Sequence, residues 1–105
     1  MNKETIQPLF QCPVCGYDEL PDKPWSENCG GSQEICPSCG IQFGYTDAAG
    51  GDTKKRQSIH RQWRQQWINQ GMSWDSIGIA PPPEWNPKAQ LEALLKHEQK
   101  ERESS

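Results

Sequence analysis

Four of the five cysteines occur in two matching segments, CPVCG at 12–16 and CPSCG at 36–40, with twenty residues between Cys15 and Cys36. In each segment the proline and the glycine favour a tight turn that directs both sulfurs toward one point. Two such turns, or knuckles, supply four thiolates at about 2.3 Å from a tetrahedral zinc ion. The spacing therefore predicts a metal site whose ligands are Cys12, Cys15, Cys36 and Cys39.

The rest of the composition suits a chain that depends on such a site for its stability. Only 32% of the 105 residues are hydrophobic, and the chain contains 9 glycines and 9 prolines. A chain this short and polar buries too little apolar surface to be stable on its core alone. A structural zinc site adds about 10–16 kcal/mol to folding. Because four thiolates leave no open position for water or substrate, we expect one Zn(II) per chain in a structural role.

The same cysteines have other interpretations. A disulfide framework is disfavoured, because the number of cysteines is odd and the sequence shows no export signal. Iron is the alternative to zinc, as a single ion or an Fe–S cluster, because four thiolates suit both metals. The two knuckles also resemble those of rubredoxin, a one-iron electron carrier, which makes electron transfer the alternative function. The intervening stretch is shorter than in rubredoxins, and the long Trp-rich tail has no counterpart in them.

The pattern along the chain predicts a small α+β fold, in which a zinc ribbon with short antiparallel strands is followed by two α-helices. Residues 9–45 form the metal-binding ribbon, because aromatic and β-branched residues flank the knuckles. Residues 53–71 form a basic, Trp-containing helix with an N-cap at Asp52 or Thr53 and a glycine at its end, Gly71. The apolar stripe of this helix consists of Ile59, Trp63 and Trp67.

Residues 72–102 complete the same single domain with a Pro-rich connection and a C-terminal helix. Three consecutive prolines at 81–83 favour an extended spacer. Asn86 followed by Pro87 is typical of a helix start. We expect most of the five tryptophans to pack the helices onto the ribbon. The apolar face of the C-terminal helix consists of Leu91, Leu94 and Leu95.

Charge is unevenly distributed, with a balance of −6 over residues 1–52 and +5 over residues 53–70. The basic helix is therefore either a partner-binding face or a solvated face that balances the acidic N-terminal section. An acidic protein is favoured as the partner over nucleic acid, because the net charge is −3 and the pI is near 5.3. A weak nucleic-acid-binding zinc ribbon is the third functional hypothesis. The candidate partner-binding residues are Lys54, Lys55, Arg56, Arg61 and Arg64.

The remaining reactive residues predict no catalysis. We expect Cys29 to be an incidental loop thiol, because it has no basic neighbour in the sequence, and His60 to lie on a helix surface. The sequence has no nucleophile elbow, zinc-protease motif or phosphate-binding glycine loop, so we expect a protein that is not an enzyme. It also has no membrane-spanning stretch and no secretory leader, which predicts a cytoplasmic protein with no membrane partner.

Four longer segments of the sequence resemble those of a known protein family. The strings CPVCGYDEL, EICPSCGIQFGYTD, QWRQQWINQGMSW and PPPEWNPKAQL resemble the cysteine-rich CPCC family of small, mostly uncharacterised bacterial proteins, over about residues 10–95. This sequence has CPVC and CPSC where the family name implies a further cysteine, so the two segments supply four cysteine ligands and no additional one. The resemblance implies a cytoplasmic bacterial protein with a zinc-ribbon-like N-terminal half. Members of small families of this kind can serve as immunity or antitoxin partners.

Overall fold

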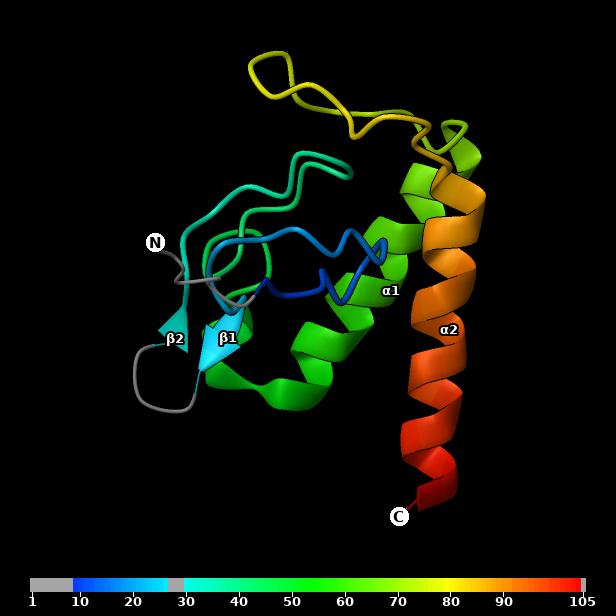
Figure 1. The fold of residues 1–105 in the computed structure, drawn as a ribbon. Helices are drawn as coiled ribbons and strands as arrows, with labels where there is room; N and C mark the ends of the chain where they lie inside the picture. Colours follow the sequence, from blue (N-terminus) through cyan, green and yellow to red (C-terminus); the bar gives the residue numbers. More distant parts are fainter. Residues whose placement is uncertain (1–8, 27–29, 105) are drawn as a thin grey trace, which may run out of the picture.

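The computed structural model describes residues 9–26 and 30–104, which form a small α+β fold (Figure 1). Strands β1 (Trp25–Ser26) and β2 (Gly30–Gly31) pair antiparallel. A short 3-10 turn, η1 (Ala49–Gly51), leads into helix α1 (Thr53–Asn69), and helix α2 (Pro87–Ser104) follows a long connection. The predicted class, with short antiparallel strands and two helices, is confirmed. No helix in this described part of the chain has the length and apolarity needed to cross a membrane.

Side-chain caps fix the start of both helices. Asp52 Oδ1 accepts a hydrogen bond of 3.0 Å from the backbone N–H of Lys55, so Asp52 rather than Thr53 is the N-cap of α1. Asn86 Oδ1 caps α2 in the same way and accepts a first-turn N–H at 3.0 Å. Pro87 takes the first helical position, where a backbone N–H would have no partner within the helix. Local sequence signals therefore determine where both helices begin.

Helix α1 ends at a glycine with left-handed backbone. Gly71 has a φ of +92°, which glycine adopts without the steric cost of a Cβ atom. Its N–H donates to the Ile68 carbonyl at 3.0 Å, and the N–H of Met72 donates to the Trp67 carbonyl at 2.8 Å. These two bonds form the Schellman arrangement that satisfies carbonyls at helix C-termini. The helix itself stops at Asn69, two residues short of the predicted limit.

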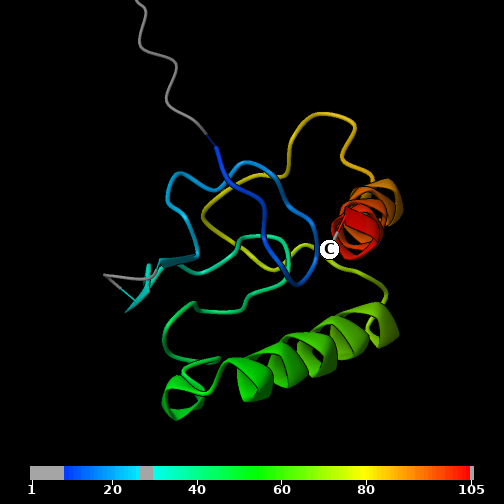
Figure 2. The ribbon, with the colours of Figure 1, turned by 90° about the horizontal axis from the view of Figure 1, so that it is seen from below.

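The core lies between the cysteine-bearing coil and the two helices, which cover different sides of that coil (Figure 2). Of the predicted stripe on α1, Trp67 is buried, whereas Ile59 and Trp63 are half-buried. Of the predicted apolar face of α2, Leu91 and Leu94 are buried, whereas Leu95 is 42% exposed. The buried residues are Cys12, Val14, Cys15, Tyr17, Leu20, Cys36, Cys39, Ile41, Phe43, Trp67, Leu91 and Leu94.

All five tryptophans pack in or against this core, as expected, and each indole N–H has an acceptor. Trp74 holds the connection between the helices in place. Its ring meets those of Tyr17 and Trp85 edge to face, with centroids 5.6 and 5.0 Å apart, and its Nε1 donates to the Ile79 carbonyl at 2.7 Å. Such aromatic pairs add about 0.5–1.5 kcal/mol beyond the area that they bury. The tryptophans therefore replace part of the aliphatic core that the chain lacks.

Candidate metal centre

The two knuckles share one pattern of backbone hydrogen bonds. In the first, the N–H of Gly16 donates to the Cys12 carbonyl at 3.0 Å, and the N–H of Cys12 donates to the Tyr17 carbonyl at 2.7 Å. The corresponding bonds of the second knuckle measure 2.8 and 2.9 Å. Gly16 and Gly40 close the turns with φ values of +91° and +82°. Antiparallel bridges then join the flanking residues of each knuckle, Phe10 with Leu20 and Ile35 with Gln42.

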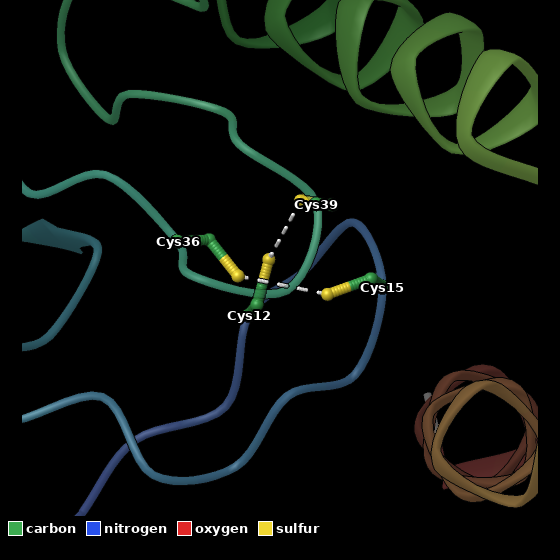
Figure 3. Close-up of side chains that lie close together, drawn as sticks. All are labelled: Cys12, Cys15, Cys36 and Cys39. Atoms are coloured by element: carbon green, nitrogen blue, oxygen red, sulfur yellow. Dashed lines mark hydrogen bonds between the residues drawn. The ribbon is translucent and has the colours of Figure 1, made fainter. Parts of the chain in front are cut away.

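This arrangement brings together the four predicted metal ligands. Figure 3 shows the sulfurs of both knuckles directed toward one another, and the four Sγ atoms all lie within 4.8 Å of one another. The Cys12–Cys39 and Cys15–Cys36 sulfurs are 3.9 and 3.7 Å apart. Ligand atoms at about 2.3 Å from the centre of a tetrahedron lie about 3.8 Å apart. All four cysteines are free thiols rather than disulfides, so the cluster is consistent with a metal-binding site.

Burial sets the electrostatics of the cluster, because three of the sulfur-bearing residues are 0% exposed and Cys39 is 6% exposed. Burial raises the pKa of the Cys12 and Cys39 thiols, since the interior disfavours a thiolate. Burial also acts on Cys15, but hydrogen bonds from the Cys12 and Cys36 thiols outweigh it and lower the pKa of Cys15. Further thiolates would repel one another here, and a divalent cation at the centre would offset that repulsion.

Arg64 of α1 binds the first knuckle directly. Its Nε donates to the Val14 carbonyl at 2.7 Å, and one terminal nitrogen donates to the Pro13 carbonyl at 3.0 Å. The same nitrogen lies 2.9 Å from Glu98 Oε2 of α2, so one guanidinium links both helices to the knuckle. Arg64 was predicted as a candidate partner-binding residue. In the structure its hydrogen bonds go to Pro13, Val14 and Glu98 of the same chain.

Gln90 of α2 contacts both knuckles and was not among the predicted site residues. Its Nε2 donates to the Cys15 carbonyl and to Ser38 Oγ, each at 3.1 Å. Its Oε1 accepts the indole N–H of Trp85 at 2.8 Å, which fixes the orientation of the amide. On the opposite side, Trp63 of α1 donates to the Cys39 carbonyl at 2.8 Å. No local pattern marks Gln90 for this role, because its partners lie far away in the sequence.

The other basic residues of α1 divide into two groups. Lys54, Lys55 and Arg61 are exposed. Arg56 is half-buried: its guanidinium lies 3.5 Å from the centroid of the Trp25 ring, and its Nε donates to the Asp47 carbonyl at 3.3 Å. Part of the predicted basic face therefore contacts the rest of the fold, and the exposed lysines and Arg61 make up its solvent-facing part.

His60 does not lie on the surface as expected. Its side chain is 12% exposed, and its Nε2 lies 2.6 Å from Oδ2 of Asp47, which is completely buried. An ionised carboxylate only accepts hydrogen bonds, so the imidazole is the donor. Asp47 was not predicted to be buried, because it stands in a small, Gly-rich stretch with the composition of a solvent-exposed loop. Cys29, which is predicted to be an incidental loop thiol, lies outside the described residues.

The fold and the cluster define a small α+β protein with a buried four-cysteine site between two CPxCG knuckles. Comparisons of the chain with protein-family models, curated proteins and solved structures found no match.

Proposed function

We propose that this chain is a non-enzymatic zinc-binding protein in which one Zn(II) bound by Cys12, Cys15, Cys36 and Cys39 has a structural role. The observation that carries the proposal is the buried cluster of four sulfurs within 4.8 Å. Four thiolates fill a tetrahedral shell, so a bound zinc ion keeps no position for a substrate. A cluster this compact suits a single ion, because multi-iron clusters bind their cysteines on separate iron atoms.

The folded unit would act by binding another protein. Exposed charged and apolar groups support this part of the proposal: Lys54, Lys55 and Arg61 on α1, and Ile77 and Ile79 in the connection, of which Ile77 is 103% exposed. The net charge of −3 disfavours a polyanionic partner such as nucleic acid. The resemblance to the CPCC family agrees with a role as an immunity or antitoxin-like partner.

The metal content of freshly purified, untagged protein tests the zinc proposal. We expect one zinc per chain and no visible absorption, because Zn(II) has a filled d shell. One iron per chain with strong visible absorption would contradict the proposal. It would make a rubredoxin-like electron carrier the function instead, and the reduction potential would then be the next measurement.

Single serine substitutions test the ligands. Cys12→Ser and Cys39→Ser should each abolish stoichiometric metal binding and unfold at least residues 9–45, because the metal supplies much of the folding free energy. Cys29→Ser is the matched control and should keep both the metal and the fold. The measurements are metal content by mass spectrometry and thermal unfolding by circular dichroism. Loss of metal in Cys29→Ser alone would show that the ligand assignment is wrong.

A further inference from the structure

A groove of about 810 Å³ lies on the surface beside the first knuckle, and none of the four clustered cysteines lines it. The start of the first knuckle and the segment that leads into β1 form one wall, with Phe10, Pro13 and Pro24 as apolar residues. Helix α1 lines the groove from Thr53 to Arg64, and Glu98 and Glu101 in the C-terminal half of α2 also line it. The groove is therefore built from segments far apart in the sequence.

Its charge is mainly positive. The basic lining residues are Lys23, Arg56, His60, Arg61 and Arg64. The two acidic lining residues already have partners within the chain, since Glu98 pairs with Arg64 at 2.9 Å and Glu101 pairs with His97 at 3.4 Å. Lys23 and Arg61 have no hydrogen-bond or ion-pair partner among residues 9–26 and 30–104. The groove thus presents positive charge that the described chain does not neutralise.

One buried residue, Asp47, holds three of the lining side chains in place. Asp47 is 0% exposed, and its Oδ2 accepts the Trp25 indole N–H at 2.8 Å and the His60 imidazole at 2.6 Å. Its backbone carbonyl accepts Nε of Arg56 at 3.3 Å, and the Arg56 guanidinium stacks 3.5 Å over the Trp25 ring. A site whose side chains are ordered before binding loses less conformational entropy when a ligand arrives.

We propose that this groove binds an extended acidic peptide segment of a partner protein. The inference rests on the proposed protein-binding function and assigns a site to it. Peptide carboxylates match the charge of Lys23 and Arg61, and the arginine guanidinium is geometrically suited to a carboxylate. The apolar wall at Phe10 and Pro24 offers contacts to a side chain between two acidic positions.

Selection of peptides from a displayed random library on the metal-loaded protein tests the proposal. We expect the enriched sequences to be rich in Asp and Glu. A fluorescein-labelled copy of the most enriched peptide is then titrated against variants. Lys23→Glu and Arg61→Glu should each raise its Kd at least about tenfold, because each reverses a charge that faces the ligand. Lys88→Glu makes the same change from a basic to an acidic side chain at an exposed position of α2 outside the groove and should leave the Kd within about twofold.

Several results would overturn the groove as an acidic-peptide site. Neutral or basic peptides could be enriched, Lys88→Glu could weaken binding as much as Arg61→Glu does, or a labelled single-stranded oligonucleotide could bind more tightly than the peptide with the same sensitivity to Arg61→Glu. Metal content is measured on each variant. One zinc per chain together with failed peptide selection would reject the groove proposal alone, whereas acidic peptides insensitive to both variants would leave the protein-binding function and place it elsewhere.

Discussion

Asp47 is a completely buried acid whose carboxylate accepts three hydrogen bonds. One comes from the Trp25 indole, one from the Gly44 backbone and one from the His60 imidazole, at 2.8, 2.7 and 2.6 Å. Burial opposes ionisation, but the hydrogen bonds from His60, Trp25 and Gly44 outweigh it and hold the pKa of Asp47 below its usual value. The carboxylate is therefore charged at neutral pH and organises the side chains around it.

Replacing this carboxylate with an amide should destabilise the fold. We expect Asp47→Asn to lower the free energy of unfolding by about 2 kcal/mol at pH 7, because hydrogen bonds to a charged group are worth roughly 1.5–3 kcal/mol. Asp52→Asn is the control, since asparagine caps a helix about as well as aspartate and its cost should be a few tenths of a kcal/mol. Urea unfolding of the metal-loaded proteins measures both. Equal losses in the two variants would show that the buried network contributes nothing.

The pH dependence of that difference follows from the sign of the pKa shift. The pKa of Asp47 is lower in the folded chain than the value of about 3.9 in the unfolded chain. The stabilisation is therefore fully present above the unfolded pKa and is lost as the pH falls through the folded pKa. The difference between wild type and Asp47→Asn should not decrease between pH 7 and pH 5.5, because both values lie above the unfolded pKa of the carboxyl group. A difference that fell between these two pH values would contradict the assignment.

At the scale of single elements, each knuckle depends on a glycine that also allows close packing. Gly16 has a φ of +91°, and a Cβ atom added there would lie 2.4 Å from the Gln90 carbonyl oxygen in α2. That oxygen belongs to the backbone, so it cannot move without moving the helix. Gly50 also has a positive φ of +59°, but a Cβ atom there would have nothing within 4 Å. An alanine at Gly50 would therefore add backbone strain alone, whereas an alanine at Gly16 would add backbone strain and a steric clash with α2.

Gly16→Ala should cost about 3 kcal/mol of unfolding free energy, because a left-handed alanine and an overpacked contact each cost roughly 1–3 kcal/mol. Gly50→Ala should cost only about 1 kcal/mol, from backbone strain alone. Urea unfolding gives both values, and hydrogen exchange of the α2 amides shows whether the helix has moved from the knuckle. Similar losses for the two variants, or unchanged exchange in α2 of Gly16→Ala, would contradict the close packing of Gly16 against α2.

The knuckles and the helix starts could be predicted from the sequence because nearby residues determine them. The CPxCG turns, the Asp52 cap and the Asn86-Pro87 start all depend on groups a few positions apart. The direction of side chains across the fold could not be predicted in this way. Arg64 meets a carbonyl 50 residues away, and Gln90 meets one 75 residues away. The sequence of a basic helix face does not indicate which of its arginines and lysines will form hydrogen bonds with other parts of the same chain.

For the molecule as a whole, the four-cysteine cluster and both helices form one connected unit. Helix α1 binds the knuckles through Arg64 and Trp63, which donate to carbonyls of Val14, Pro13 and Cys39. Helix α2 binds them through Gln90 and is joined to α1 by the Arg64–Glu98 pair. These acceptor carbonyls belong to the knuckles, so the hydrogen bonds to both helices form only while the knuckles are folded. Ordering of the cysteines should therefore be thermodynamically linked to docking of the helices.

Disruption of Gln90 tests this linkage from the helix side. Gln90→Glu keeps the shape of the side chain but replaces the donor to the Cys15 carbonyl and Ser38 Oγ with an oxygen, so both hydrogen bonds are lost and the new oxygen repels the carbonyl. We expect metal affinity to fall about tenfold, because docking and metal binding share free energy. Glu92→Gln changes an exposed residue of α2 and should leave the affinity unchanged. Competition with a colorimetric chelator measures it, and equal affinities in both variants would refute the linkage.

Removal of the metal tests the linkage from the opposite side. The Trp63 indole donates to the Cys39 carbonyl, and Trp74 and Trp85 form an edge-to-face pair beside the knuckle residue Tyr17, so tryptophan signals report on both helices. Stepwise addition of a strong chelator should release the metal, shift tryptophan emission to the red and abolish the near-UV circular dichroism in a single coincident transition. Readdition of zinc under reducing conditions should restore all three signals together, because the free thiols rebind the ion. Metal release with unchanged tryptophan signals would mean that the helices pack on the coil without the metal, and the site would then not be what stabilises the fold.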